Sequence, residues 1–118
     1  MSPVAYKLVE ADEWRRALEA GAYAGSAVDL ADGYIHMSTG SQLAETARRH
    51  YAGRDGLVLV TVQLEGLGPA LKWEPSRGGE LFPHLYGPLP TSAALDARRL
   101  SVESAGVMHF EDGHVGWP

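Results

Sequence analysis

The segment from Leu57 to Leu64 constrains the fold more than any other part of this chain. It reads Leu-Val-Leu-Val-Thr-Val-Gln-Leu, apolar first and then alternating. β-branched residues are enriched in strands, and a run of this kind is typical of a strand in the interior of a sheet. Gly56 precedes the run, and a turn rich in glycine and proline follows it. We therefore predict a central strand here, with its partner strands supplied from elsewhere in the chain.

The residues before this strand predict one strand and two helices. Residues 4–9 alternate as a first strand would, and Asp12 stands where an N-cap would precede a helix that Gly21 ends. After a polar stretch of small residues, residues 33–38 read as a short strand that enters a second helix. The signals for that helix are capping-box spacing at its start and a glycine at its end, from Thr39, Gln42 and Gly53.

The residues after the central strand predict mostly strands. Residues 70–73 form a brief strand, and the glycines and proline of residues 74–80 predict an irregular loop. Residues 81–87 are extended but contain Pro83, which favours a sheet edge or an irregular segment. Residues 93–102 predict another strand, and Asp112-Gly113 predicts a hairpin within residues 107–115. These elements predict an α+β fold with two early helices, as one domain spanning residues 1–118.

Composition excludes several classes of protein. The 118 residues contain no cysteine, which excludes disulfides, thiol catalysis and cysteine-ligated metal sites. The formal net charge is −5 and is spread evenly, so we expect no broad binding of duplex nucleic acid. No stretch approaches the roughly 20 apolar residues of a membrane span, and the N-terminus does not read as a secretory signal. We therefore expect a cytoplasmic protein that does not contact membranes.

Residues 34–38 form the first group with chemical potential. In an extended strand Ile35 and Met37 face one side, while Tyr34, His36 and Ser38 face the other. His36 and Ser38 would then lie at the start of a helix, where backbone N–H groups favour an anion such as phosphate. The alternative is a strand histidine bonded to a neighbouring carbonyl, with the serine helping to cap the helix.

Residues 73–86 form the second group. It offers two carboxylates, a cation, an imidazole and several aromatic rings, in a segment of irregular sequence. Loops held by a rigid sheet often carry binding sites. In an extended run Glu80, Phe82, His84 and Tyr86 would share one face. The alternative is a solvated loop in which the aromatic and aliphatic residues plug the core.

No metal site is expected. His109 and His114 flank two acidic residues, but the tip of an Asp-Gly hairpin accounts for those acids, and no further ligand is evident. Glycine-rich phosphate loops, the serine nucleophile elbow and the HExxH zinc helix are all missing from the sequence. Kinase-like, hydrolase-like and zinc-protease functions are therefore disfavoured.

Three stretches of this chain resemble a bacterial family known only as domain of unknown function 952. The motifs have the forms G-[FY]-I-H-x-S-T and E-L-F-P-H-[IL]-Y-G, and the resemblance covers nearly the whole chain. The matching stretches are residues 32–39, 49–53 and 79–87. The family name implies no activity.

The order of elements also resembles, more distantly, the ADP-ribosyltransferase fold and its RNA 2′-phosphotransferases. That resemblance implies a split antiparallel sheet around a crevice that takes NAD as a substrate. His36-Met37-Ser38-Thr39 matches one motif, so His36 and Ser38 would face the nucleotide. Tyr6-Lys7-Leu8-Val9 stands where the first motif would be, so by this resemblance the histidine of that motif is replaced by Lys7 or absent. Glu80 would be the late glutamate that stabilises a positively charged ribosyl transition state.

Three functions follow from these expectations. The first is an NAD- or nucleotide-using transferase or phosphotransferase, in which Glu80 or His84 acts as the electrostatic or acid–base group. The second is a binding module for a nucleotide or phosphorylated metabolite that lacks catalysis. The third is a protein-interaction domain. Either small-molecule function would use Lys7 together with ligand-binding residues from both groups, namely His36, Ser38, Arg77 and Tyr86. A metabolite site predicts that His36 and either Glu80 or His84 converge in one cleft.

Overall fold

The structure, a computed structural model, describes residues 3–117 and has an α+β fold. Within this range, three α-helices and a series of antiparallel strands alternate with three 3₁₀ turns. The helices are α1 (Ala11–Ala20), α2 (Ala27–Asp32) and α3 (Leu43–His50). The strands are β1 (Val4–Glu10), β2 (Ala22–Tyr23), β3 (Ile35–His36), β4 (Leu57–Gln63), β5 (Leu71–Pro75), β6 (Leu81–Leu85), β7 (Leu89–Pro90), β8 (Ala94–Val102) and β9 (Met108–Phe110).

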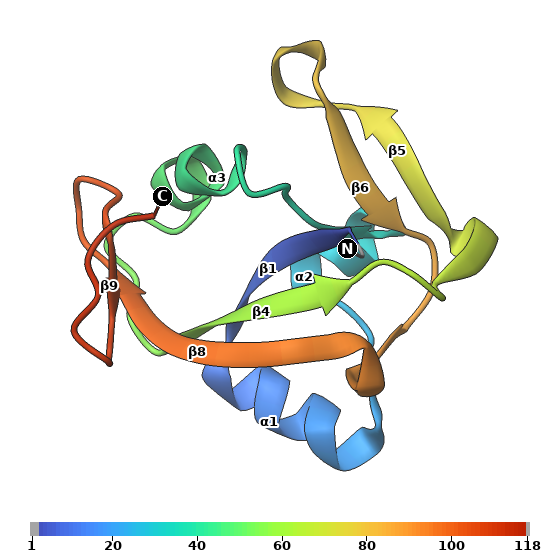
Figure 1. Cartoon of the computed structure of the whole chain (residues 1–118), viewed down its shortest axis with the longest axis horizontal. Coiled ribbons are helices and arrows are strands. Elements are labelled where there is room, and N and C mark those ends of the chain that lie inside the picture. The colour runs from blue at the N-terminus through green and yellow to red at the C-terminus, as the bar shows by residue number, and fades with distance from the viewer. Residues whose placement is uncertain (1–2, 118) are drawn as a thin grey trace.

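The main sheet has the strand order β1-β4-β8-β9, and β4 lies in its interior as its sequence predicts. Figure 1 shows β4 running between β1 and β8, with α1 packed along one side of the sheet. Val58, Val60 and Val62 of β4 face one buried cluster, while Leu57 and Leu59 face a second cluster on the opposite side. Because both faces of β4 are covered, the strand is apolar at almost every position.

A second sheet has the order β3-β6-β5, and its β5–β6 hairpin extends away from the rest of the molecule (Figure 1). The two sheets are joined where Tyr6 of β1 exchanges backbone hydrogen bonds with Ser38, at 2.8 and 2.9 Å. This junction directs the polar residues of β1 and β3 toward the same region of the molecule.

The expectation that Pro83 confines residues 81–87 to an edge is wrong. β6 is the middle strand of its sheet, and Pro83 pairs with Trp73 of β5. On the other side, the carbonyl of Pro83 accepts a hydrogen bond from the Met37 amide at 3.1 Å. β3 ends at His36, so the ladder on this side is nearly finished where the proline nitrogen, which has no proton, occurs. A middle strand tolerates proline here because its neighbour is so short.

The helices also differ from expectation. The prediction of two early helices omits α2, which has only six residues and begins with a capping box between Ser26 and Asp29. Asp12 is not an N-cap, because α1 begins one residue after Glu10 and Asp12 lies in its first turn. The Gln42 side chain, just before α3, accepts a hydrogen bond from the Thr39 amide at 3.0 Å. The helix itself starts only at Leu43 and ends at His50, before Gly53.

The loop predicted for residues 74–80 is shorter than expected. β5 continues through Glu74 and Pro75, which pair with Phe82 and Leu81, so that a tight tip remains with a 3₁₀ turn at Arg77–Gly79. The strands expected at residues 70–73 and 93–102 are confirmed as β5 and β8. The hairpin at Asp112-Gly113 is reduced to β9 and a single bridge between His109 and Val115. No helix within residues 3–117 has the length and apolar character needed to cross a membrane.

Candidate functional site

Asp29 on α2 is the centre of the polar network beneath the first group of candidate residues. Its side chain is buried, and its carboxylate lies 3.1 and 3.2 Å from the Lys7 ammonium. The backbone N–H groups of Ser26 and His36 donate to it at 2.9 and 3.1 Å. The His36 ring nitrogen Nδ1 lies 2.6 Å from the same carboxylate. Burial alone would raise the pKa of Asp29, but these hydrogen bonds and the Lys7 charge hold it below its ordinary value.

Lys7 is therefore committed to Asp29. It extends from β1 on the same face as Ala5 and Val9, and only 6% of it is exposed. Burial lowers the pKa of Lys7, although the Asp29 carboxylate opposes that shift. A buried ammonium already neutralised by a carboxylate has little charge left for an anionic ligand. Lys7 fixes Asp29 in place more than it attracts phosphate.

His36 is held between two carboxylates and remains about one-third exposed. Nδ1 faces Asp29, and Nε2 lies 3.0 Å from Asp32, an exposed residue at the end of α2. The α2 helix thus supplies both carboxylates: Asp32 lies four residues before His36, and Asp29 lies seven residues before it. The buried Asp29 fixes the plane of the ring. The exposed Asp32 can move aside and leave Nε2 to a ligand.

These residues line a cleft of about 550 Å³ between β1, α2 and the C-terminal end of α3. Its size lies within the range of small-molecule sites. Lys7, Asp29, Asp32 and His36 line one part of it, and further lining residues are Glu13, Tyr23, Thr46, His50, Arg54 and Ser76. Of the expected ligand-binding residues, only Lys7 and His36 line this cleft.

Arg77 lies beside the rim of the cleft. Its guanidinium donates to the Thr46 hydroxyl at 3.3 Å and to the Gln42 carbonyl at 3.4 Å, and it stacks over the Phe82 ring. Within the described part of the chain it pairs with no carboxylate. Partial burial and the charge of Arg77 lower the pKa of the nearby His50. This rim is where the cleft has an uncompensated positive charge.

Ser38 has a structural environment. It is buried, and its hydroxyl contacts the Thr46 hydroxyl at 2.8 Å. The Thr46 hydroxyl in turn donates to the Gln42 carbonyl at 3.1 Å, at the start of α3. Ser38 does not line the cleft. The alternative interpretation, in which this serine supports the beginning of the helix, describes its position better than contact with a ligand.

The second group packs directly against the first. Tyr34 stacks on His84 with ring centroids 4.2 Å apart and lies 4.5 Å from the His36 ring. His84 is buried, and its Nδ1 lies 2.8 Å from the Glu74 carboxylate. The Tyr86 hydroxyl donates to the same carboxylate oxygen at 2.7 Å. The β3–β6 register pairs His36 with His84, and their ring centroids are 5.6 Å apart, but His84 does not line the cleft that His36 lines.

Glu80 does not join this arrangement. It is exposed at the tip of the β5–β6 hairpin, and its side chain makes no hydrogen bond or ion pair within residues 3–117. Phe82 is buried and Tyr86 is partly exposed on the face that also carries His84. The structure thus brings His36, His84 and Tyr86 together through Tyr34, and leaves Glu80 apart.

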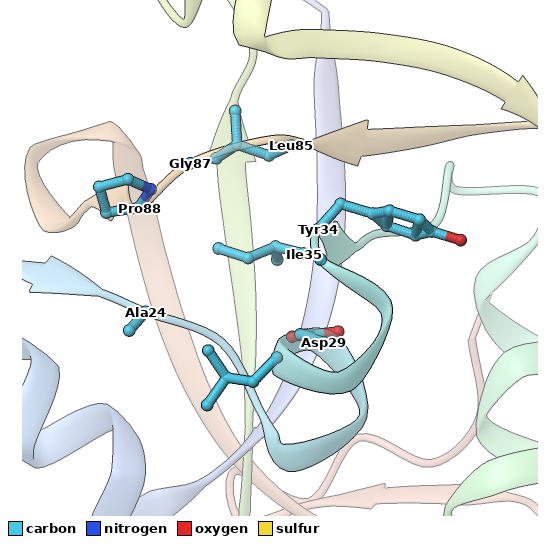
Figure 2. Close-up of a pocket in the computed structure, with 9 residues that line it drawn as sticks. Ala24, Asp29, Tyr34, Ile35, Leu85, Gly87 and Pro88 are labelled. Carbon is cyan, nitrogen blue, oxygen red and sulfur yellow. The ribbon is translucent and has the colours of Figure 1, made fainter.

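A smaller pocket of about 260 Å³ lies on the other side of α2, and Asp29 borders both spaces. Figure 2 shows Ala24 and Pro88 at one end of this pocket, whereas the Tyr34 ring points away from them toward the opposite side. Backbone and aliphatic groups make up most of its wall. It offers few polar groups to a ligand, so the larger cleft is the better candidate site.

Comparison with known proteins places this chain in a family. The family model described as "Protein of unknown function (DUF952)" matches residues 8–97, which include the three helices, β3, β4 and the β5–β6 hairpin. The chain belongs to the DUF952 family.

Solved structures of a similar protein share the fold of this chain. The crystal structure of protein CC0527 from Caulobacter crescentus is 48% identical to this DUF952 protein, with a TM-score of 0.84, and the match covers 89% of this chain and 92% of CC0527. The solution NMR structure of CC0527 gives a TM-score of 0.76 at 48% identity, covering 87% and 89% of the two chains. Comparison with curated proteins gives no match. The resemblance to the 952 family is therefore confirmed, and the more distant ADP-ribosyltransferase resemblance stays an expectation.

Several residues of this DUF952 site escape sequence reasoning. Asp29 lies in a helix that was not predicted, and the capping-box spacing from Ser26 is its only local signal. Glu74 was recognised as a carboxylate of the second group, but its hydrogen bonds depend on the β5–β6 register. Glu13 and Tyr23 reach the cleft from α1 and β2, and nothing in their sequence context marks them. Among residues 3–117, no group of three or more His, Asp or Glu side chains is arranged to hold a metal ion.

Proposed function

We propose that this DUF952 protein binds a nucleotide-type ligand in the 550 Å³ cleft and uses it in a transfer reaction, with NAD as the leading substrate. The observation that carries this proposal is the Asp29–His36 pair. A buried carboxylate fixes one ring nitrogen at 2.6 Å, while the other nitrogen lies at the partly exposed side of the ring. This arrangement is suited to binding a hydroxyl group or to moving a proton.

The acidic side of the cleft suits the sugar of a nucleotide. Ribose hydroxyls donate hydrogen bonds well to carboxylates. In dinucleotide-binding folds an acidic residue accepts such a bond from the ribose. Asp32 and His36 lie 3.0 Å apart at this position, and Asp32 is half exposed. A ribose diol can take the place of their mutual contact and leave both groups hydrogen-bonded. This assigns the sugar, and not the phosphate, to His36.

The phosphate would lie at the rim beside Arg77. This guanidinium has no carboxylate partner within residues 3–117, and its hydrogen bonds to Thr46 and Gln42 are long, at 3.3 and 3.4 Å. Guanidinium groups bind phosphate through two parallel hydrogen bonds. His50 lies close enough to feel the Arg77 charge, and an anion bound between them would stabilise its protonated form.

In the transfer reaction the bond between ribose and nicotinamide breaks, and an acceptor oxygen bonds to the ribose. His36 is placed to take the proton of that oxygen. His84 would be the electrostatic or acid–base group. It would act from behind the Tyr34 ring, on which it stacks with centroids 4.2 Å apart. Glu80 would stabilise the positive ribosyl charge only if the ligand extends to the hairpin tip, where its carboxylate faces solvent.

A binding module without catalysis is the second candidate function. Under the ADP-ribosyltransferase resemblance the transferases' first-motif histidine is replaced by Lys7 or absent, and Asp29 neutralises the Lys7 ammonium at 3.1 Å. A residue that is buried and paired in this way cannot hold a nicotinamide-side ribose as a free histidine would. Binding of the nucleotide without release of nicotinamide would favour this second function.

The test combines thermal shift with an assay of nicotinamide release. The ligands are NAD, ADP-ribose, AMP and a 2′-phosphorylated dinucleotide. A ligand present at about 100 times its dissociation constant adds roughly 2.7 kcal/mol of stability. We expect a shift with NAD or ADP-ribose that is lost in His36→Ala and kept in His109→Ala, because His109 pairs with Glu103 away from the cleft. Flat melting curves for the whole panel at millimolar concentration would refute nucleotide binding.

A further inference from the structure

The β5 strand is an open edge of the second sheet. It pairs with β6 on one side, and no strand within residues 3–117 pairs with it on the other side. The hairpin that carries it stands out from the rest of the molecule (Figure 1). An exposed edge strand presents backbone N–H and C=O groups that can pair with a strand of another chain. The free edge of β5 is therefore a surface on which a further strand can be added.

Trp73 directs its backbone groups toward this open edge. It lies opposite Pro83 of β6, and the Pro83 carbonyl accepts from Met37, on the side of β6 away from β5. Opposed residues of an antiparallel pair either bond to each other or both point away from each other. The N–H and C=O of Trp73 therefore point away from β6. The Leu71 N–H already donates within the preceding 3₁₀ turn, and Pro75 has no N–H, so any pairing along this edge centres on Trp73.

One face of the hairpin presents apolar side chains to solvent. Trp73 is 45% exposed, and Leu81, which pairs with the exposed Pro75, is 53% exposed. The β5–β6 register places all three on the same face. None of them lines the cleft or the smaller pocket beside α2. Exposed apolar groups that gather in one patch mark contacts between proteins, and tryptophan is enriched in such contacts.

The charges on the other face make β5 complementary to itself. Lys72 and Glu74 flank Trp73 in the strand, where Lys72 lies 5.1 Å from the Tyr86 ring and Glu74 contacts His84. If a second β5 lies antiparallel with the two Trp73 residues opposite each other, each Lys72 faces the Glu74 of the other copy. A slip of two residues in one direction sets lysine against lysine, and in the other direction glutamate against glutamate. Like charges directly opposite are destabilising, so the charges favour the register centred on Trp73.

We propose that β5 is the interface of a symmetric dimer, in which it pairs antiparallel with β5 of a second copy of this chain about Trp73. The two Trp73 residues exchange a pair of backbone hydrogen bonds, and their rings lie next to each other on the apolar face. A Lys72–Glu74 ion pair lies on either side of them on the opposite face. Both copies use the same patch, so the contact closes on itself and assembly stops at two chains. This inference goes beyond the proposed function, because β5 does not line the cleft.

The test is sedimentation equilibrium of the full chain over a range of concentrations. A single pair of short strands buries less area than the roughly 1,200 Å² of a standard interface, so we expect a dissociation constant between roughly 50 μM and 1 mM. The average mass should rise with concentration from that of one chain toward that of two. NMR spectra of the labelled chain over the same range should show that the amide signals that move belong to residues 71–75.

Charge variants test the register. In Lys72→Glu, glutamate faces glutamate across the interface, and the protein should stay a single chain. Glu74→Lys sets lysine against lysine and should also stay a single chain. An equal mixture of the two variants should form dimers again, because every opposed pair then has opposite charges. Glu74→Lys also loses its contacts with His84 and Tyr86, so its folding is checked by circular dichroism. Lys72 is exposed, and Lys72→Glu tests the interface even if Glu74→Lys does not fold.

Two neutral variants localise the apolar part of the contact. Trp73→Ala removes the ring pair and should weaken association by roughly fivefold or more. The matched control is Leu95→Ala on β8, which removes a side chain that is 56% exposed and should leave the dissociation constant unchanged. A mass of one chain up to about twice the weakest expected dissociation constant, or unchanged association in Lys72→Glu, would overturn the β5 dimer. The nucleotide proposal would stand in that case, because its test depends on His36 and the cleft.

Discussion

Asp29 is the residue on which the candidate site depends most. Its carboxylate connects β1 through Lys7, α2 through the Ser26 amide, and β3 through both the amide and the ring of His36. The alternating pattern of residues 34–38 did predict that Ile35 and Met37 face the core and that His36 faces the other side. The pattern could not predict Asp29, because its partners come from three different elements that only the folded topology brings together.

We expect Asp29→Asn to lower the free energy of unfolding by about 3–5 kcal/mol. The substitution leaves the buried Lys7 ammonium without its counter-charge, and breaking a buried pair in this way is strongly destabilising. Asp32→Asn is the matched control, because Asp32 is half exposed and contacts the other nitrogen of the same histidine, and it should cost no more than about 1 kcal/mol. Urea unfolding measures both. Similar losses for the two variants would contradict the role given to Asp29.

The same carboxylate predicts how stability depends on pH. The folded-state pKa of Asp29 lies below its unfolded-state value near 4, so its contribution is complete above that value and is lost as the pH falls through the acid range. The urea midpoint should therefore decline steeply below about pH 4. Asp32→Asn should keep this decline. A midpoint that stays level into strong acid would show that Asp29 is not held as described.

The contact between Glu74 and Tyr86 predicts a measurable shift in the pKa of Tyr86. The hydrogen bond of Glu74 with the Tyr86 hydroxyl, and then partial burial, raise the pKa of Tyr86 to about 12. In Glu74→Gln the negative charge is gone, and the pKa of Tyr86 should fall toward the ordinary value of about 10. Lys72→Gln is the control, because Lys72 lies 5.1 Å from the Tyr86 ring and its loss cannot lower that pKa. Tyrosine ring signals followed by NMR against pH measure this, and equal pKa values in both variants would refute the contact.

At the scale of elements, the strands were the most predictable part of the fold. The apolar residues 57–60, with Val62 and Leu64 after them, follow from burial on both faces of β4. The short α2 was missed because six residues carry too little helical periodicity, and its stability comes from the capping box and the burial of Asp29. The place of Pro83 in a middle strand could not be predicted, because it depends on how soon the neighbouring β3 ends.

The turn between β8 and β9 packs closely against α3 at Gly106. This glycine has φ +92°, and a Cβ added there would lie 2.6–2.8 Å from Arg48, including the backbone Cα of that residue. Gly113 has a similar φ of +97°, but a Cβ would meet nothing within 4 Å. Both alanine variants bear the backbone cost of about 1–2 kcal/mol, and Gly106→Ala should lose about 1–3 kcal/mol more through overpacking. Equal melting temperatures for the two variants would mean that the turn does not press on α3.

At the scale of the whole molecule, the two sheets meet where Tyr6 bonds to Ser38, and the cleft opens beside this junction. The junction explains why residues predicted as one site divide into a cleft with Lys7 and His36, a packed group with His84 and Tyr86, and the separate Glu80. Spacing along a strand gives the face of each residue. It does not give the distance between two sheets. The sequence could therefore identify most of the candidate side chains but not which of them lie together in the fold.

The most direct test of the central claim is an NMR titration of the isotopically labelled chain with ADP-ribose. If the cleft is the nucleotide site, the amide signals that shift will belong to residues around it, including Lys7, His36, His50 and Ser76. The signals of the β8–β9 turn near Gly113 should stay in place, because that turn does not line the cleft. Shifts confined to the β5–β6 hairpin tip, or no shifts at millimolar ligand, would contradict the proposed function.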